Sequence, residues 1–170
     1  MRICGALRVL EIGTLGGYST IWMARALPEH GRIVTLEFNP HHAEVARTNF
    51  QRAGVADRVD LRVGRAIESL PKLVGTSDAT FDLIFIDADK ESYAEYLDWA
   101  VKLSRPGTVI VADNVVRDGK VIDPECEDPR VQGIRRFAAR LATEPRVSTT
   151  AMQTVGAKGY DGFTLAVVLQ

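Results

Sequence analysis

The sequence predicts an α/β fold in which helices cover both faces of a doubly wound, mostly parallel sheet. Short apolar runs rich in β-branched residues alternate with segments of helical periodicity, which is the pattern of βαβ units. The run Phe81–Ile86 is almost continuously apolar, as expected of a strand buried on both faces. With 170 residues and neither repeat nor linker, we expect residues 1–170 to form a single domain.

The first half of the chain is expected to contain three strands, each followed by a helix. The strands are predicted at residues 8–12, 32–36 and 59–63. The helices are predicted at residues 18–27 and 40–53, with a short one ending near residue 71. In the second of these helices Pro40 suits the first turn and Gly54 ends the segment. Its apolar stripe consists of Ala43, Ala46, Phe50 and Ala53.

The second half continues the alternation after a loop at residues 75–80. Strands are expected at 81–86, 108–112, 147–151 and 163–168, with a long loop rich in charge, Gly and Pro at 116–129. One helix is predicted at 131–142. Another precedes the strand at 108–112, and its apolar stripe consists of Tyr93, Tyr96, Leu97, Ala100 and Val101.

Composition and charge exclude several classes of protein. Hydrophobic residues are 46% and charged residues 25%, which is typical of globular domains and not of disordered or fibrous chains. The formal net charge of −1 gives no overall attraction to nucleic acid or anionic membranes. Cys4 and Cys126 fit no zinc-binding spacing, and no apolar run approaches the ~18–20 residues of a membrane span. We therefore expect a cytoplasmic protein with unpaired cysteines and no membrane partner.

A glycine-rich turn and an acidic residue follow the first two predicted strands. Gly13, Gly16 and Gly17 let a ligand approach the backbone, although their spacing departs from the G-x-G-x-x-G dinucleotide fingerprint. Glu37 ends the second strand, where a carboxylate can accept hydrogen bonds from both ribose hydroxyls of an adenosine, and Phe38 can pack on the base. These features favour a nucleoside pocket over a glycine turn without a ligand. Ala66, after the third strand, either lines the adenine or only begins a helix.

Acidic and amide side chains follow two further strands. Asp87 and Asp89 come after residues 81–86, and Asp113 and Asn114 come after residues 108–112. Carboxylates brought together without compensation repel one another and raise each other's pKa. The oxygen ligands of Asp87, Asp113 and Asn114 suit a hard divalent cation such as Mg²⁺. The alternative is that these Asp residues only cap helices.

Several stretches together carry a resemblance to a known family. They are Glu11-Ile12-Gly13-Thr14, Gly17-Tyr18-Ser19, Glu37, Ile86-Asp87-Ala88-Asp89-Lys90 and Ala112-Asp113-Asn114. The sequence resembles the metal-dependent class I O-methyltransferases, the catechol and caffeoyl-CoA O-methyltransferase family, and its bacterial branch most. The resemblance covers essentially the whole chain. It implies a seven-stranded, Rossmann-like methyltransferase sheet with an antiparallel last strand.

The resemblance also implies a cofactor and residues that bind it. S-adenosylmethionine would be held through its methionine part by Glu11, Gly13, Thr14 and Ser19, through its ribose by Glu37, and at its adenine by Ala66. Asp89 would face the amino group of the cofactor. The residues assigned to cofactor binding are Glu11, Gly13, Thr14, Gly17, Ser19, Glu37, Phe38, Ala66, Asp87 and Asp89.

The implied reaction moves a methyl group from the sulfonium of the cofactor to a hydroxyl of a catechol-like diol. Asp87, Asp113 and Asn114 would bind Mg²⁺ or another divalent cation, whose charge lowers the pKa of the bound phenol. Lys90 is the candidate general base or oxyanion partner, against the alternative of an ordinary exposed lysine at a helix start. Lys90 and Asp87 are thus the expected catalytic residues. Asp118 stands where some relatives have an Asn that touches substrate.

One departure from the family concerns the start of the chain. Relatives usually carry several helices before the first strand, which cover the cofactor, contact the acceptor and help to build a dimer. Here the first strand already begins at Arg8. The interpretations left open are a truncated chain, a mis-assigned start and a naturally shortened protein, each lacking that cover. The family still implies a homodimer.

Three other functions compete with this one. The first is methylation of a hydroxylated tRNA base. The net charge argues against it, but Arg130, Arg135, Arg136 and Arg140 could form a local basic patch. The second is a module that binds S-adenosylmethionine without catalysis. The third, a nicotinamide oxidoreductase, is disfavoured by the absence of G-x-G-x-x-G.

Overall fold

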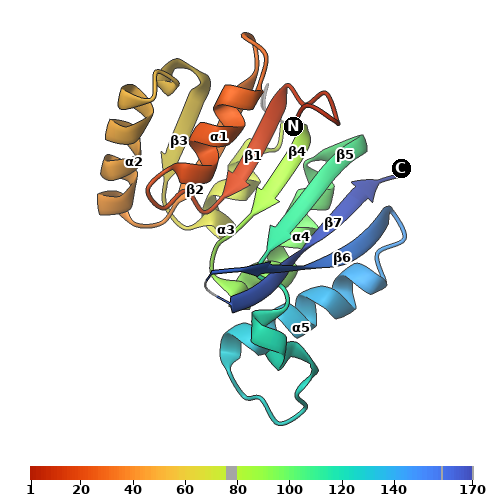
Figure 1. Cartoon of the computed structure of the whole chain (residues 1–170). Helices are drawn as coiled ribbons and strands as arrows, with labels where there is room; N and C mark the ends of the chain where they lie inside the picture. The colour runs from red at the N-terminus through yellow and green to blue at the C-terminus, as the bar shows by residue number, and fades with distance from the viewer. Residues whose placement is uncertain (76–79, 158, 170) are drawn as a thin grey trace. The chain divides into compact units, whose positions relative to one another are not determined.

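The computed structural model describes residues 1–75, 80–157 and 159–169. In this part of the chain seven strands form one sheet with the order β3-β2-β1-β4-β5-β7-β6 (Figure 1). Strands β1, β2 and β3 pair in parallel, whereas β7 runs antiparallel to both β5 and β6. The predicted fold class, a mostly parallel Rossmann-like sheet with an antiparallel last strand, is therefore confirmed.

The chain divides into two compact units, residues 1–85 and 86–170, and each is described by itself. A single domain over residues 1–170 stays a prediction. None of the helices that the structure describes is both long and apolar enough to cross a membrane.

The first unit contains four strands with the helices that connect them. The strands are β1 (Arg8–Ile12), β2 (Arg32–Glu37), β3 (Val59–Val63) and β4 (Phe81–Ile86), the last residue of which opens the second unit. The helices are α1 (Tyr18–Ala26), α2 (Pro40–Arg52) and α3 (Ala66–Ser69), with 3₁₀ turns η1 (Ala56–Arg58) and η2 (Leu70–Leu73). Helix α2 lies beside β3 (Figure 1).

Local sequence signals explain where α2 begins and which face it buries. The Asn39 side chain accepts a hydrogen bond from the His41 N–H at 2.9 Å, and Pro40 occupies the first turn. Of the predicted stripe, Ala43, Ala46 and Phe50 are buried, whereas Ala53 is the C-cap residue and is only half-buried. The helix is thus held by its apolar face, as its periodicity predicts.

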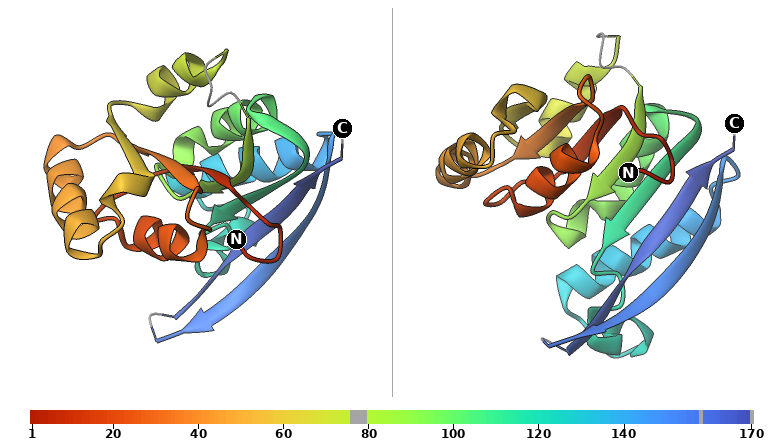
Figure 2. Two further views of the ribbon diagram at one scale, coloured as in Figure 1. Left: turned by 90° about the horizontal axis from the view of Figure 1, so that it is seen from above. Right: turned by 45° about the horizontal axis from the view of Figure 1, so that its top comes forward.

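The second unit contains three strands and two long helices. The strands are β5 (Ser104–Asp113), β6 (Val147–Gly156) and β7 (Gly159–Val168), and the helices are α4 (Tyr93–Lys102) and α5 (Pro129–Ala142). Two 3₁₀ turns, η3 (Lys90–Ser92) and η4 (Arg117–Ile122), precede the helices. Strands β6 and β7 form a long hairpin whose outer strand is β6 (Figure 2). The apolar stripe predicted for α4 is buried throughout.

Several predicted details are corrected by the structure. The stretch 116–129 is not all loop, because residues 117–122 form η4 and α5 already begins at Pro129, capped by the Asp128 side chain. Strands β5, β6 and β7 extend well beyond the predicted cores. In β6 and β7 the additional residues pair with each other in the antiparallel hairpin, which orders polar residues that carry no apolar signal. A tryptophan in an amphipathic helix is normally expected to pack on the apolar face, but Trp22 of α1 is 57% exposed. Most of the loop predicted at 75–80 lies outside the described residues.

Gly133 lets α5 approach the backbone of η3 closely. A Cβ built on Gly133 would lie 2.7 Å from Glu91 Cα and would collide with the Lys90 carbonyl oxygen. Both obstacles are main-chain atoms, which cannot move aside as the end of a flexible side chain can. The contact between α5 and the turn that carries Lys90 therefore requires glycine at this position.

Replacing Gly133 with Ala should lower the free energy of unfolding by about 1–2 kcal/mol, because forced separation of packed elements typically costs about 1–3 kcal/mol. Helix propensity alone predicts the opposite sign, a gain of roughly 0.5–1 kcal/mol. Urea unfolding followed by circular dichroism measures the difference. Ala139→Gly, at an exposed site of the same helix, is the control and should lose only the propensity amount. A Gly133→Ala protein more stable than the wild type would contradict the packing argument.

Candidate functional site

In the first unit, the end of β1 carries a buried carboxylate bound by three hydroxyls. Glu11 is 0% exposed. Its Oε1 accepts a hydrogen bond from Ser19 Oγ at 2.5 Å, and its Oε2 accepts hydrogen bonds from Thr20 Oγ1 at 2.5 Å and Thr35 Oγ1 at 2.6 Å. Thr14 Oγ1 in turn lies 2.6 Å from Thr35 Oγ1. Glu11 therefore joins β1, α1 and β2 through charge-assisted hydrogen bonds, which are the strong ones.

The turn after β1 is shaped by glycine at two of its predicted positions. Gly13 has φ 101° and donates its N–H to the Leu36 carbonyl at 3.0 Å. Gly17 has φ 84°, and a Cβ there would collide with the Phe50 ring. Leu15 also adopts φ 50°, which is uncommon for a residue other than glycine. Gly13 and Gly17, which the sequence singled out, therefore have backbone conformations that favour glycine.

Glu37 ties this turn to the end of β2. It is 7% exposed, and its Oε2 accepts a hydrogen bond from the Leu15 N–H at 2.8 Å. Its Oε1 accepts one from the Asn39 N–H at 2.9 Å and lies 3.4 Å from His42 Nδ1. A carboxylate has about four acceptor positions, so these partners leave acceptor capacity for ribose hydroxyls. Beside it, Phe38 is 71% exposed.

The predicted residue of the third loop lies in the same unit. Ala66 is the first residue of α3 and is half-buried. The preceding Gly64, with φ 144°, donates its N–H to the Glu37 carbonyl at 2.8 Å. This backbone hydrogen bond connects the end of β2 with the loop after β3. Glu37 and Ala66, both predicted to bind the nucleoside, therefore lie in connected segments.

In the second unit, Lys90 is a buried lysine rather than an exposed one. Its side chain is 9% exposed, and Nζ donates hydrogen bonds to Asp87 Oδ1 at 2.9 Å and to the Tyr93 hydroxyl at 2.6 Å. Gly133 admits α5 against the turn that begins at Lys90. A buried ammonium is tolerated only when it is paired, and Asp87 supplies the opposite charge. The alternative of an ordinary solvated lysine is not what the structure shows.

The predicted metal ligands belong to this unit as well. Burial raises the pKa of the Asp113 carboxyl above its usual value, and the Asp87 charge adds to the rise, while the Asn114 N–H and Lys90 oppose it. The Asn114 N–H donates to Asp113 Oδ1 at 2.8 Å, and Asn114 adopts φ 59°. The Asp87 and Asp113 carboxylates repel each other, which a hard divalent cation would relieve, and Asn114, the residue after Asp113, carries a further oxygen donor. The residues present thus fit such an ion.

This set is small. Among the described residues there is no group of three or more His, Cys, Asp and Glu side chains placed to hold a metal ion. The predicted set contains only two carboxylates, with an amide as its third member. Such a site leaves coordination positions for water or for oxygen atoms of a substrate.

Asp89 and Asp118, the remaining predicted positions, lie on the surface. Asp89 is exposed and accepts a hydrogen bond from the Tyr96 hydroxyl at 2.6 Å. Asp118 is exposed with φ 55°, and its carbonyl accepts the Tyr160 hydroxyl at 2.7 Å. Asp161 fixes the start of this loop, because its Oδ1 accepts the Val116 and Arg117 N–H groups at 2.9 and 3.0 Å.

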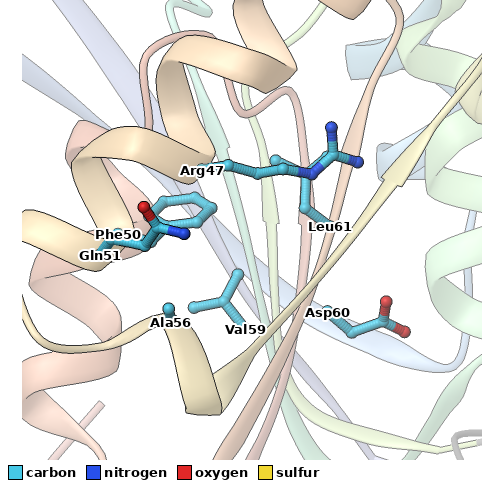
Figure 3. Close-up of a pocket in the computed structure, with 7 residues that line it drawn as sticks. All are labelled: Arg47, Phe50, Gln51, Ala56, Val59, Asp60 and Leu61. Carbon is cyan, nitrogen blue, oxygen red and sulfur yellow. The ribbon is translucent and has the colours of Figure 1, made fainter.

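A hollow of about 340 Å³ in the first unit is separate from the predicted residues (Figure 3). It lies between α2, η1 and the first residues of β3. It is lined by Arg47, Phe50, Gln51, Ala56, Val59, Asp60 and Leu61. Ligands of open parallel sheets bind at the carboxyl ends of strands. This hollow is at the amino end of β3, so it is not where such a ligand is expected.

Three residues of the site were missed from the sequence, although two of the signals were present. Thr35 is the polar residue inside the apolar run of β2, which marks a buried hydroxyl. Tyr93 follows Lys90 by three residues, a spacing that lets two side chains meet. Thr20 gave no signal, because a threonine in an amphipathic helix looks like any other polar position.

The fold and these residues define a class, the Rossmann-like methyltransferases. A model of the O-methyltransferase family matches residues 1–168, and the chain belongs to that family. This confirms the resemblance to the catechol and caffeoyl-CoA type, and with it the class of enzyme, an S-adenosylmethionine-dependent O-methyltransferase.

Individual relatives place the chain more narrowly. It is 57% identical over 167 residues to a catechol O-methyltransferase of Niastella koreensis, a match covering 98% of this chain and 76% of that protein. A catechol O-methyltransferase of Mycobacterium tuberculosis is 55% identical, over 96% of this chain and 72% of the relative. The solved O-methyltransferase TomG of Streptomyces achromogenes, in complex with SAM, has a TM-score of 0.96 and 54% identity over 99% of this chain and 76% of its own.

Replacing Glu11 with Gln should lower the free energy of unfolding by about 1–3 kcal/mol. The three hydroxyls donate to the carboxylate, and an amide nitrogen in place of one carboxylate oxygen sets an N–H donor against at least one of them. Chemical denaturation measures the loss. Glu44→Gln, at an exposed position of α2, is the matched control and should stay within about 0.5 kcal/mol of the wild type. Equal stability of the two variants would show that the hydroxyls do not depend on the carboxylate.

Proposed function

We propose that this chain transfers the methyl group of S-adenosylmethionine to one hydroxyl of a catechol-like diol with the help of a divalent cation. The observation that carries the proposal is the arrangement of Lys90, Asp87 and Asp113. A buried lysine is paired with Asp87, and burial together with the Asp87 charge raises the pKa of Asp113. Perturbed groups of this kind cluster at functional sites. Identity of 55–57% to two catechol O-methyltransferases supports the acceptor class.

Binding of the cofactor is assigned to residues at or after the ends of β1, β2, β3 and β4. Glu37 would accept the ribose hydroxyls, and the exposed Phe38 ring would pack against the base. Ser19, held by Glu11, would face the methionine part. Asp89, oriented by Tyr96, would accept the amino group. The residues with the same assignment are Glu11, Gly13, Thr14, Gly17, Ala66 and Asp87. A solved Bacillus cereus relative, 60% identical with a TM-score of 0.95, was crystallised with SAH.

Asp87, Asp113 and Asn114 would hold a divalent cation, for which Mg²⁺ is the expected ion because all three supply oxygen atoms. When bound, such an ion lowers the pKa of a coordinated phenol and orients the diol. The chain's own contribution is to fix the ligands. The Asn114 N–H holds the Asp113 carboxylate, and Lys90 holds that of Asp87.

Lys90 is the residue proposed to handle the acceptor proton. The methyl carbon leaves the sulfonium sulfur as its bond to the acceptor oxygen forms, so that oxygen must lose its proton. A neutral Lys90 Nζ takes that proton as general base. When Nζ is charged, the proton leaves to solvent water and the ammonium stabilises the oxyanion that remains. Methyl transfer from a sulfonium needs alignment more than activation of the leaving group, which suits a site built from fixed strand ends.

We propose that the chain works as one methyltransferase domain in the cytoplasm. The two cysteines, Cys4 and Cys126, are both free, which supports a reducing compartment. The alternative of a tRNA substrate finds less support, since the four arginines of the suspected patch have intramolecular partners. Arg130 pairs with Asp128, Arg135 donates to carbonyls of residues 120–123, Arg136 donates to the Glu91 carbonyl, and Arg140 pairs with Asp98 and Glu144.

Transfer of labelled methyl groups to a panel of catechols should require a divalent cation, so EDTA should abolish turnover and Mg²⁺ restore it. Asp113→Ala should lower kcat/KM by at least about 100-fold, because loss of a ligand to a catalytic ion typically removes most of the effect of that ion. Glu95→Gln, an exposed carboxylate of α4, is the control and should retain full activity. Turnover that persists in EDTA would remove the metal assignment. Binding of S-adenosylmethionine without turnover would favour a non-catalytic module.

We also propose that the chain forms a homodimer through the edge strand β6. From Val147 to Gly156 this strand has no charged residue and no proline, and all of it except Val147 is exposed. Edge strands are normally protected by charges, proline or cover, so a long neutral edge can pair with another strand. A twofold axis sets the same segment against itself, and neutral residues allow that pairing without repulsion.

Thr150→Lys should shift the chain from dimer to monomer in sedimentation equilibrium, because a twofold pair of β6 strands would bring two like charges together. Thr143→Lys, an exposed position after α5, carries the same charge change away from the edge and should leave the dimer intact. A wild-type chain that sediments as a monomer, or a Thr150→Lys dimer of unchanged affinity, would rule out this interface.

A further inference from the structure

The hydroxyl of Tyr93 stands at the centre of a short hydrogen-bond chain in the second unit. It lies 2.6 Å from Lys90 Nζ, 2.9 Å from the Asp113 carbonyl oxygen and 3.2 Å from the Ile86 carbonyl oxygen. Lys90 Nζ continues the chain to Asp87 Oδ1. One phenol therefore touches the last residue of β4, the last residue of β5 and the proposed base.

The direction of these hydrogen bonds follows from counting protons. Lys90 Nζ as an ammonium has only donors, so the phenol oxygen accepts from it. The single phenol proton must then go to a carbonyl, and the Asp113 oxygen is the nearer of the two. Burial, followed by the charges of Asp87 and Asp113, raises the pKa of Tyr93 far above its usual value, so this proton stays in place.

Tyr93 is the rigid partner of Lys90, whereas Asp87 is the exposed one. The Tyr93 ring is 0% exposed and packs edge-on against Phe137 of α5 at 5.6 Å between ring centroids. The Asp87 side chain is 42% exposed at the end of β4. A lysine side chain has four rotatable bonds, and a carboxylate in solvent alone does not fix them. The buried phenol does, because its ring cannot move within a packed core.

We propose that Tyr93 is a positioning residue that fixes the Lys90 amine beside Asp87 through its hydroxyl, and that methyl transfer depends on this placement. The inference deepens the proposed function, since it concerns the base of that reaction. It assigns to Tyr93 more than core packing. The ring fills space, while the hydroxyl determines where the Lys90 nitrogen lies relative to the ends of β4 and β5.

Tyr93→Phe keeps the ring and removes only the hydroxyl. We expect kcat to fall by roughly 10- to 100-fold, because a displacement of about 1 Å at a reacting group can cost about 100-fold. KM for S-adenosylmethionine and for the catechol should change by less than about twofold, since no proposed binding contact to either is removed. A crystal structure of the variant should show Nζ displaced from its 2.9 Å contact with Asp87.

Thr108→Val is the matched control, because it removes another fully buried hydroxyl from the same unit, within β5. It should lower the melting temperature as Tyr93→Phe does but keep kcat. An equal loss of kcat in both variants would mean that Tyr93 acts only through stability. An unchanged kcat, or Nζ in its wild-type position in the Tyr93→Phe crystal structure, would overturn the proposal. If the wild-type chain shows no turnover, the proposed function fails separately, and the crystallographic comparison still decides whether Tyr93 positions Lys90.

Discussion

Compensation of buried charge is the constraint on which both units of this chain depend. Glu11 in the first unit and Lys90 in the second are charged groups almost removed from water. An isolated charge in such a place would cost several kcal/mol, so each must be surrounded by fixed partners. Glu11 has three hydroxyls, and Lys90 has a phenol and a carboxylate. Loss of a partner would leave the buried charge of Glu11 or Lys90 without part of its hydrogen bonding.

The same constraint sets the conformation of the loops that follow the strands. The partners of Glu11 come from α1 and β2, so the turn after β1 must be tight enough to bring Ser19 back over the strand end. Among the described residues other than glycine, positive φ occurs only at Leu15, Asn114, Arg117 and Asp118. All four follow β1 or β5. Strained backbone of this kind persists where the surroundings over-determine it, which is often at functional sites.

The sequence predicted the fold well because its signals were local and repeated. Buried strands such as Phe81–Ile86 and the stripe of α2 depend on periodicity, which one chain displays in full. The extent of β6 could not be predicted, since its exposed Thr and Gln residues become strand only by pairing with β7. The turn η4 was missed for a similar reason. It is held by Asp161 from β7 and by Arg135 from α5, both distant in sequence.

The candidate site was predictable as a set of residues but not as a network. Asp87, Asp113 and Glu37 can be identified from their positions at strand ends, because open parallel sheets bind ligands at the carboxyl ends of their strands. Lys90 differs from an ordinary lysine at a helix start because it is buried. Burial results from tertiary packing and cannot be deduced from residue spacing. Asp87 shows what the network adds. Its carboxylate accepts the Lys90 hydrogen bond, and its charge adds to the effect of burial in raising the pKa of Asp113 and of Tyr93. Asp87 is therefore proposed both as a catalytic residue and as a metal ligand, because its carboxylate interacts with Lys90 and with Asp113.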